Sequence, residues 1–271
     1  ALDHFAQGLA LYRTVGDGRN QASVLNNMGT VYNLLNDPEK AFFYFQQALP
    51  LARASGDRGL EAVTLTNMGN VYNLLEHSPD NLQKALEHLN QGLALTREID
   101  DRRTEAGALT HMGTTYALLK DQPKAVEYLE RALQMRIAVS DRQGEAITLN
   151  HFGRAFDMWL QPQKAFEFYD KALPIWRAVG DRNGEVAALY GMARAESDLD
   201  HLVPASQLTE AALAIINTLR TKVSSRYLRA SYFASVHDLF KLHIDLLMRL
   251  HRRQPAAGFD VAALKTYEQA R

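Results

Sequence analysis

His111 and His151 are the first side chains whose type and spacing suggest chemistry, because they take matching places in neighbouring stretches of similar sequence. Paired imidazoles can bind a transition metal, but a stable site needs further ligands at suitable spacing, and the sequence offers no third one. The chain also has no cysteine, which excludes disulfides, thiolate ligands and a cysteine nucleophile from its 271 residues. We therefore expect ordinary packing or surface histidines, with no metal and no cofactor.

A catalytic site is equally hard to assemble from this sequence. No Ser/His/Asp arrangement, glycine-rich phosphate loop or carboxylate pair recurs at a spacing that would bring its members together. The 30 Lys and Arg residues nearly balance the 31 Asp and Glu residues, and no basic stripe with interleaved aromatic residues marks a nucleic-acid surface. No apolar run approaches the roughly 20 residues of a membrane span, and the N-terminus has no signal-peptide pattern. These residues predict no enzyme, no nucleic-acid or membrane partner, and a cytoplasmic location.

A row of amide and hydroxyl side chains is the stronger candidate for function. Residues three or four apart share one face of a helix, and this row avoids the packing face that Leu25, Met28 and Tyr32 define. Because carboxamides both donate and accept hydrogen bonds, a ladder of them suits the backbone of an extended peptide. For any single member, a solvated helix face is the simpler interpretation. The predicted peptide groove comprises Ser23, Asn26, Thr30, Asn33, Thr66, Asn70, Asn73, Thr110, Thr114, Asn150, Arg154, Asp157 and Arg194.

Two arginines distinguish the C-terminal part of this row. Arg154 and Arg194 take corresponding places forty residues apart. Guanidinium groups bind carboxylates and phosphates through paired hydrogen bonds, so this part of the groove is predicted to favour such groups. The alternative is that these arginines pair with Asp157 or Asp198 within the chain.

The elements that position these residues follow from an internal repeat. The stretches "NNMGTVYNLL" (26), "TNMGNVYNLL" (66), "THMGTTYALL" (110), "NHFGRAFDMW" (150) and "YGMARAESDL" (190) align with a period of forty residues, stretched once to forty-four. Each period contains two helical patterns joined by a tight turn. We expect residues 1–16 to be the second helix of a truncated repeat, followed by repeats at 20–56, 59–99, 103–139, 143–179 and 183–218.

Glycine and aspartate mark fixed places in these repeats. A glycine falls in the middle of the first helix, where it costs about 1 kcal/mol relative to alanine, so the partner helix is expected to approach closely there. An aspartate precedes the first helix and is expected to cap its N-terminus. The glycines are Gly29, Gly69, Gly113 and Gly153, and the aspartates are Asp57, Asp101, Asp141 and Asp181.

The recurring pattern of small and aromatic residues resembles the tetratricopeptide repeat over residues 1 to about 218. The forty-residue period with "GDRxGE" between units is similar to the long-helix subclass of Pins/LGN-type adaptors and kinesin light chain. The resemblance implies an all-α solenoid of about five helical hairpins, whose first helices line a concave groove for peptides or proteins. The fifth repeat departs from the pattern, since Ala193, Glu196 and Thr209 replace Gly, Tyr and an aromatic residue. The lysine of the chaperone-binding clamp is absent three residues before the helix glycine, so chaperone-tail binding is not predicted.

The segment 219–271 does not follow the repeat. It contains "LRASYFASVHDLFKLHIDLLMRLH" (228–251), which predicts a long helix with apolar residues on two faces. The repeats can cover one of these faces, so the second is expected to pack against another part of the chain or against a partner. The residues assigned to a domain-coupling role are Tyr232, Phe233, Val236, Phe240 and Leu247.

The stretches "LRASYFASVHDLF" and "ALKTYEQAR" resemble the junction between a tetratricopeptide array and a CHAT domain in bacterial proteins. The resemblance implies that a caspase-like protease domain follows Arg271, and that this chain is a sensor or regulatory region for that domain in cis. None of the protease's catalytic residues has a counterpart in these 271 residues. The alternative is a stand-alone adaptor in which the long helix is a cap or a dimer interface.

Overall fold

The computed structural model of the chain describes residues 2–220 and 226–270, without the side chains of residues 220 and 226–236. Within these ranges all regular elements are helices: thirteen α-helices and one short 3-10 helix. The all-α fold class predicted from the repeat is confirmed. No helix within the same ranges is at once long and apolar enough to cross a membrane. The helices form two compact units, Ala1–Gly144 and Glu145–Arg271.

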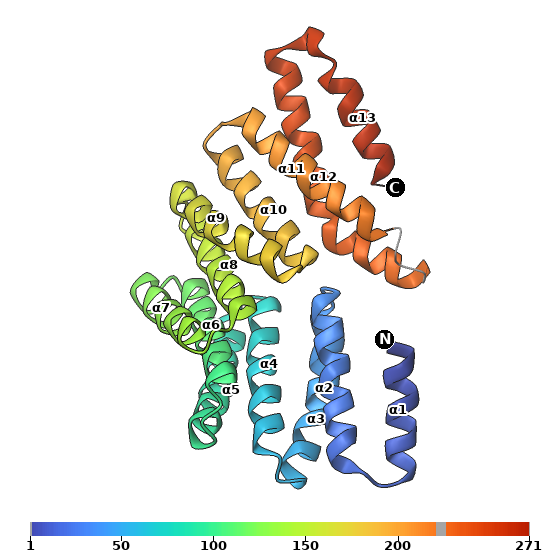
Figure 1. Cartoon of the computed structure of the whole chain (residues 1–271), viewed down its shortest axis with the longest axis vertical. Coiled ribbons are helices and arrows are strands. Elements are labelled where there is room, and N and C mark those ends of the chain that lie inside the picture. The colour runs from blue at the N-terminus through green and yellow to red at the C-terminus, as the bar shows by residue number, and fades with distance from the viewer. Residues whose placement is uncertain (1, 221–225, 271) are drawn as a thin grey trace. The chain divides into compact units, whose positions relative to one another are not determined.

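The first unit is a series of helices in which each packs against the next (Figure 1). α4 also contacts α2 on one side and α6 on the other, so the first helices of successive hairpins are neighbours. The helices are α1 (Leu2–Thr14), α2 (Gly18–Leu34), α3 (Pro38–Ala54), α4 (Arg58–Leu74), α5 (Pro79–Glu98), α6 (Arg102–Leu118) and α7 (Gln122–Ala138).

The second unit continues the hairpin pattern and ends in a longer helix pair. α10 packs against both α9 and α11, and α12 packs against α11 and α13. The elements are α8 (Arg142–Met158), which begins just before the boundary, α9 (Pro162–Val179), α10 (Arg182–Asp198), α11 (Leu202–Arg220), α12 (Arg226–Arg253), η1 (Pro255–Ala257) and α13 (Phe259–Gln269).

The helix N-termini are capped as the sequence predicts. Asp57 Oδ1 accepts a hydrogen bond of 3.0 Å from the backbone N–H of Leu60, three residues on. Asp101, Asp141 and Asp181 accept the equivalent bond at 3.1, 3.0 and 2.9 Å. Each bond satisfies one of the N–H groups that a helix N-terminus leaves without a partner, which typically stabilises the helix by about 1 kcal/mol.

Most turns between helices pass through one residue in the left-handed region of backbone conformation. Glycine takes this place at Gly56 and Gly180, while Asn36, Lys120 and Asp200 take it elsewhere. The turn after α8 is unusual because the residue with positive φ is Leu160, at 56°, and its side chain is 86% exposed. A leucine in this conformation has its Cβ close to the following carbonyl and gains no packing in return.

The mid-helix glycines allow the close approach that the sequence predicts. A methyl group at Gly69 of α4 would lie 2.5 Å from Cγ of Leu89 in α5. The two helices therefore meet at a separation that only glycine permits at this point.

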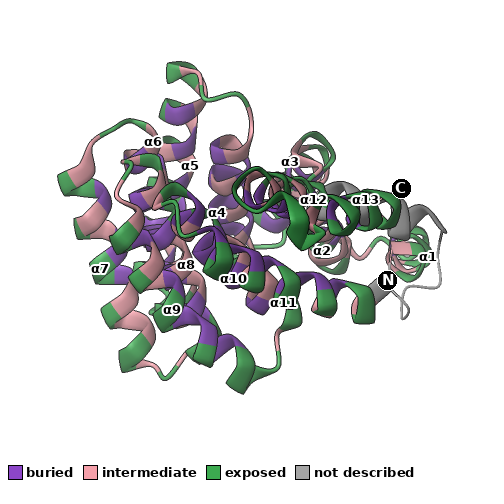
Figure 2. Cartoon of the chain, turned by 90° about the horizontal axis from the view of Figure 1, so that it is seen from above, coloured by how far each residue is buried: buried purple, intermediate pink, exposed green. Residues whose placement is uncertain are grey.

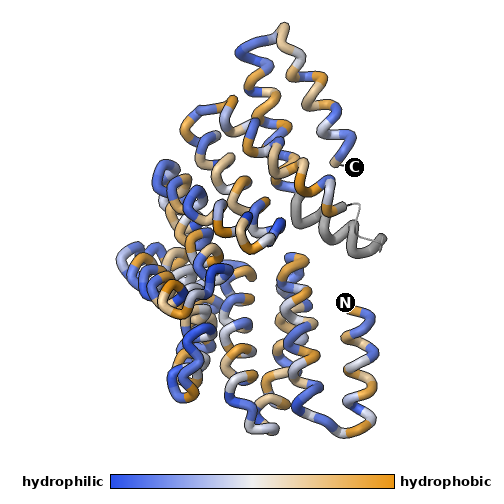
Figure 3. The backbone as a smooth tube through the Cα atoms, in the orientation of Figure 1, coloured by the Kyte–Doolittle hydropathy of each residue, from blue (hydrophilic) through white to orange (hydrophobic). Residues whose placement is uncertain are grey.

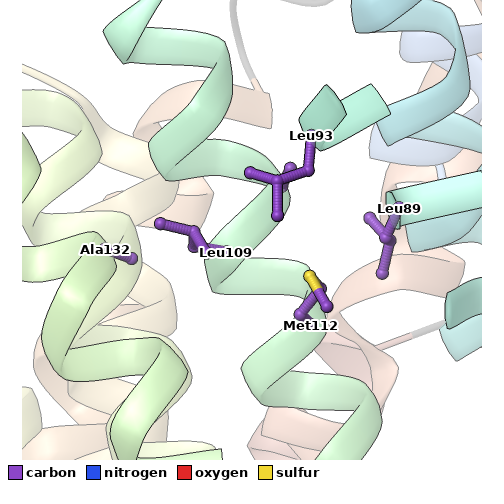
Figure 4. Close-up of a cluster of buried hydrophobic side chains, with 6 residues drawn as sticks. Leu89, Leu93, Leu109, Met112 and Ala132 are labelled. Atoms are coloured by element: carbon purple, nitrogen blue, oxygen red, sulfur yellow. The ribbon is translucent and has the colours of Figure 1, made fainter. Parts of the chain in front are cut away.

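The core is serial, as expected of stacked hairpins. In the first unit, Leu89 and Leu93 of α5 pack against Leu109 and Met112 of α6, with Ala132 of α7 beside them (Figure 4). Burying one such leucine contributes roughly 1.5–3 kcal/mol. Buried residues lie on the helix faces turned toward neighbouring helices (Figure 2), and apolar and polar residues alternate along each helix accordingly (Figure 3).

An Arg–Glu–Arg contact joins successive hairpins. Glu105, which is 5% exposed, accepts a hydrogen bond from an arginine at the end of α5 and lies beside an arginine at the start of α6. Arg97 Nε is 2.8 Å from Glu105 Oε1, and Arg102 Nη1 is 3.6 Å from Oε2. The same contact recurs at Glu61 with Arg53 and Arg58, and at Glu185 with Arg177 and Arg182.

α12 is packed within the second unit, along the part whose side chains the structure describes. Leu246 and Leu250 form a buried cluster with Leu202 and Ala205 of α11, and Phe259 at the start of α13 packs on it. Phe240 and Leu247, the residues of the second apolar stripe, are 1% and 2% exposed. The repeats and α13 together therefore bury both stripes of this helix from Leu239 onwards.

Candidate functional site on the first helices

The predicted groove residues lie on the first helices of the hairpins, α2, α4 and α6 in the first unit and α8 and α10 in the second. We call the side of these helices that carries them the first-helix face. Each unit carries its own part of this face.

Asn26 of α2 is buried and bridges two first helices. Its Oδ1 accepts hydrogen bonds from Thr64 Oγ1 at 3.3 Å and from Asn67 Nδ2 at 3.2 Å, both on α4. The side chain is 6% exposed. The prediction that Asn26 faces a peptide is therefore corrected, because α4 already takes its acceptor.

Asn73 makes the equivalent bridge from α4 to α6. Its Nδ2 donates to the backbone carbonyl of His111 at 3.1 Å, and its Oδ1 lies 2.9 Å from Oγ1 of Thr115. Asn73 is 4% exposed, and the predicted groove residues Thr66 and Thr110 are also buried. These three residues are likewise corrected from groove positions to positions between helices.

The rest of the row in the first unit is partly accessible. Ser23, Asn33 and Asn70 are half-buried, as are the two threonines Thr30 and Thr114. The threonine hydroxyls donate back to their own helices, at 3.1 Å to the carbonyl of Asn26 and 3.2 Å to that of Thr110. Asn70 of α4 therefore lies on this face, and it does not bridge to α6 as Asn73 does. Its part in ligand binding stays a prediction.

In the second unit the row centres on a buried carboxylate. Tyr169 of α9 donates a hydrogen bond of 2.9 Å to Asp157 Oδ2 of α8. The tyrosine ring reaches this position between Gly153 of α8 and Gly191 of α10, and a methyl group at either glycine would overlap it. Tyr169 is 3% exposed and the Asp157 side chain 4% exposed.

Burial raises the pKa of Asp157 above its usual value, because water no longer solvates the charged form. The hydrogen bond from Tyr169 and the positive charges of Arg194 and Arg154 oppose this shift, whereas Asp198 adds to it. Asp157 Oδ1 has no hydrogen-bond partner within the described part of the chain. Burial also raises the pKa of the Tyr169 hydroxyl, so this group stays protonated and acts as a donor.

Arg154 and Arg194 are exposed on the same face. Arg194 Nη1 lies 4.0 Å from Asp157 Oδ2, which is too long for a hydrogen bond, and its guanidinium lies 6.0 Å from the ring centre of Tyr190. Arg154 makes no ion pair with any residue that the structure describes. Asn150, one turn before Arg154, is half-buried, and its Oδ1 has no partner within the described residues.

One family model matches the sequence that builds these hairpins. Its description is tetratricopeptide repeat, and it matches residues 1–54, 60–138 and 104–178, which is more than half of the chain. The chain belongs to the tetratricopeptide repeat family. No curated protein matches its sequence.

Solved structures of tetratricopeptide-like proteins share the fold at low sequence identity. A Rap protein complexed with competence and sporulation factor is 13% identical, with a TM-score of 0.65 over 92% of this chain and 73% of that one. NprR in complex with its cognate peptide NprX is 17% identical, with a TM-score of 0.64 over 97% and 71%. A signal transduction ATPase with a tetratricopeptide repeat sensor, from Pyrococcus horikoshii, is 17% identical, with a TM-score of 0.57 over 93% and 41%.

The histidines of the tetratricopeptide array do not form a cluster. His111 and His151 are half-buried, and both have interactions with other residues. Among the side chains that the structure describes, in residues 2–219 and 237–270, no three of His, Cys, Asp or Glu are arranged to hold a metal ion.

The tetratricopeptide pattern contained a signal for the Tyr169–Asp157 contact that helix periodicity alone missed. Position 191 holds glycine where the two preceding repeats have His151 and His111. A tyrosine in the second helix combined with a glycine at this place predicts that the ring passes between two first helices. The domain-coupling residues Tyr232, Phe233 and Val236 lie outside the described side chains.

Proposed function

We propose that this chain is a protein-interaction module that binds an extended peptide or protein segment along the first-helix face of either unit. The observation that carries this proposal is one row of equivalent positions, which we call the open row. Its members are polar in all five hairpins, and the structure buries none of them. The open row consists of Thr30, Asn70, Thr114, Arg154 and Arg194.

The comparisons support a peptide ligand. NprR was solved with its cognate peptide, and the Rap protein with competence and sporulation factor. Both share the fold of this chain over most of its length. Side chains that can donate and accept hydrogen bonds, spaced along successive helices, match the alternating donors and acceptors of an extended backbone.

We further propose that the module acts as a sensor for an effector domain in cis, following the resemblance of residues 219–271 to the junction with a CHAT domain. A tetratricopeptide sensor within a larger signalling ATPase supports this arrangement. The burial of Phe240 and Leu247 inside the second unit favours the second candidate, an adaptor in which α12 caps the repeats. Cytoplasmic residence belongs to the same proposal.

Peptide display against the whole chain, followed by fluorescence anisotropy of the selected peptides, tests the binding function. Asn70→Ala removes an open-row carboxamide, and we expect it to weaken binding at least fivefold without lowering the melting temperature. Asn73→Ala removes the bridge to α6, and we expect it to lower stability by about 1–3 kcal/mol because a buried carbonyl loses its partner. Gln91→Ala, on the exposed side of α5, is the control. Selected peptides whose affinity changes neither with Asn70→Ala nor with substitution of the open-row arginines would contradict the proposal.

The intact mass of the native gene product, with thiol-probe labelling of the same sample, separates the two candidates. A product well above 30.4 kDa that carries a reactive cysteine would support the sensor. A product of this mass without a labelled cysteine would support the adaptor.

A further inference from the structure

The last helix, α13, carries a row of exposed apolar side chains. It packs on α12 (Figure 1), and its buried residues are Ala263 and Thr266. On another side of the helix, Val261 is 67% exposed, Leu264 60% and Tyr267 52%. Residues three apart lie on the same side of a helix, so these three form one row, which we call the α13 stripe. Single exposed apolar residues are common, but three together in a helix of eleven residues mark an interaction surface.

The first unit has a hollow with an apolar lining. The hollow has a volume of about 690 Å³ and lies along α7, with Arg102 at the start of α6 beside it. Its apolar lining consists of Met135, Ala138 and Val139, of which Ala138 is exposed and the other two are half-buried. This α7 hollow can therefore take apolar side chains from another surface.

Two arginines flank the apolar lining of the α7 hollow. Arg131 lies one turn before Met135, and Arg102 lies toward the other end, because α6 and α7 form an antiparallel hairpin. Their side chains are 56% exposed at Arg102 and 47% exposed at Arg131. Arg102 Nε is 2.8 Å from Asp100 Oδ1, and Arg131 Nη1 is 3.6 Å from Glu127 Oε1. Each guanidinium group has five N–H donors, so these contacts leave donors available to a partner.

Two carboxylates flank the α13 stripe. Asp260 comes directly before Val261, and Glu268 lies one turn after Leu264. Glu268 is exposed, and the side chain of Asp260 is 52% exposed. Asp260 Oδ1 lies 3.7 Å from His251 Nδ1, which is too long for a hydrogen bond. The stripe is therefore acidic at both ends, whereas the hollow is basic at both ends.

The two patterns match position for position when α13 and α7 run antiparallel. Both extend over eight helical positions, 260 to 268 in α13 and 139 to 131 in α7, which corresponds to about 12 Å in each helix. In one common register the facing groups are Asp260 with Arg102, Val261 with Ala138, Leu264 with Met135, and Glu268 with Arg131.

Lys265 distinguishes the antiparallel from the parallel arrangement. In the antiparallel register it lies about one turn from Glu130, which also lines the hollow. Glu130 makes no ion pair with any residue that the structure describes. In the parallel arrangement Lys265 would instead point its positive charge toward the end that carries Arg102. Charge complementarity therefore favours the antiparallel direction.

We propose that α13 of one copy of this chain docks in the α7 hollow of a second copy. This interaction surface is separate from the first-helix face and does not depend on the proposed function. Because the two surfaces differ, a copy that gives its helix keeps its own hollow available, so the contact can continue from copy to copy. A helix of eleven residues buries less than the roughly 1,200–2,000 Å² of a stable interface, so the association is weak.

Sedimentation equilibrium of the whole chain between about 10 μM and about 1 mM tests the contact. We expect the average mass of the native chain to rise above 30.4 kDa with concentration, because association follows mass action. Leu264→Glu in the stripe and Ala138→Glu in the hollow should each keep the mass of a single chain. Both residues are exposed, so the melting temperature should not change. Leu11→Glu, at a position of α1 that is 62% exposed, is the matched control and should associate as the native chain does.

An equimolar mixture of the two single variants tests whether the contact joins two different surfaces. Leu264→Glu keeps an intact hollow and Ala138→Glu keeps an intact stripe, so the mixture should form a dimer of one copy of each and nothing larger. If Ala138→Glu alone associates as the native chain does, α13 pairs with another α13 and the proposal is overturned. A native chain that keeps the mass of a single chain at every concentration would overturn it as well.

Exchange of charges tests the antiparallel direction. Lys265→Glu and Glu130→Lys should each weaken the association about fivefold, because each brings like charges together. A chain that carries both substitutions restores the opposite charges and should associate within about twofold of the native chain. If the double variant associates no better than the single variants, the antiparallel docking is wrong.

Discussion

The hydroxyl of Tyr169 donates a hydrogen bond to Asp157 through the space that Gly191 leaves between two first helices. The contact therefore involves three helices. Tyr169 comes from α9, Asp157 from α8, and Gly191 of α10 leaves room for the tyrosine ring. Asp157 takes the place that Asn73 takes two repeats earlier, where a carboxamide bridges to the next first helix. Because a carboxylate has no N–H to donate, Asp157 cannot make the same bridge.

Asp157→Asn is expected to stabilise the chain at neutral pH by about 1 kcal/mol. The carboxamide keeps the acceptor for Tyr169 and gains a donor for the neighbouring helix, and a buried acceptor without a partner costs about that amount. Burial raises the folded-state pKa of Asp157. Its contribution to stability is therefore greatest below the unfolded-state pKa of 3.8 and is lost as the pH rises through the folded-state value.

Urea unfolding of the native chain and Asp157→Asn between pH 4 and 7.5 measures both effects. The variant should lose the part of the pH dependence that Asp157 causes. Asp198→Asn, at an exposed position of α10, serves as the control. A variant that is less stable than the native chain at pH 7 would show that the carboxylate itself stabilises this place.

Gly191→Ala is expected to destabilise the second unit by about 1–3 kcal/mol. The new methyl group would overlap the ring of Tyr169, which is buried and cannot move aside without disturbing its neighbours. Leucine occupies the equivalent second-helix place at Leu89 and Leu129. A double-mutant cycle with Tyr169→Leu, followed by thermal unfolding, should therefore recover most of the loss. Additive effects would mean that the ring and the glycine do not interact.

Leu160→Gly is expected to stabilise the chain by about 1 kcal/mol. Leu160 has φ of 56° and an exposed side chain, so glycine relieves backbone strain and gives up little packing. Leu264, which is exposed in the middle of α13, is the matched control, because Leu264→Gly should cost about 1 kcal/mol in a helix interior. Chemical denaturation measures the free energy of unfolding of both variants. If Leu160→Gly lowers it as much as the control substitution does, Leu160 is not strained.

His243 is expected to make the packing of α12 depend on pH. It is 5% exposed, its Nδ1 lies 2.7 Å from Thr209 Oγ1 of α11, and burial lowers its pKa below the usual 6.5. The unfolded chain therefore binds a proton near pH 6.5 that the folded chain does not. Stability should fall as the pH drops below 6.5, by at most about 1.4 kcal/mol per pH unit.

Hydrogen exchange of the α12 amides at pH 5 and 7 measures this effect. His243→Asn offers Thr209 a partner that does not titrate, and it should flatten the pH dependence. His237→Asn changes an exposed histidine of the same helix and should leave the dependence as it is. If the stability of His243→Asn depends on pH as steeply as that of the native chain, groups other than His243 cause the dependence.

The sequence predicts most of the fold because the relevant signals are local and recur. Asp57 caps its helix through a residue three places on, and Gly69 lies under Leu89 of the following helix. Repetition every forty residues distinguishes these signals from chance. The expected all-α array of helical hairpins is confirmed for the same reason.

The sequence does not predict which polar residues of a first helix stay accessible. Helix periodicity separates the face of Leu25 from that of Asn26, but α4 covers part of the polar face of α2. Only a strip between these contacts remains open, and Asn70 lies on it while Asn73 does not. Similarly, the apolar second face of α12 gave no sign that the chain itself buries Phe240 and Leu247.

The Arg–Glu–Arg contacts between hairpins have a consequence for how such an array changes its length. Arg97, Arg102 and Glu105 lie within nine consecutive residues, so a period that carries these residue types brings its own contact with the neighbouring period, as at Glu61, Glu105 and Glu185. Duplicating or deleting one whole period recreates a complete junction without any compensating mutation elsewhere. Recombination within the gene can therefore extend or shorten the first-helix face in whole steps while each such junction remains intact.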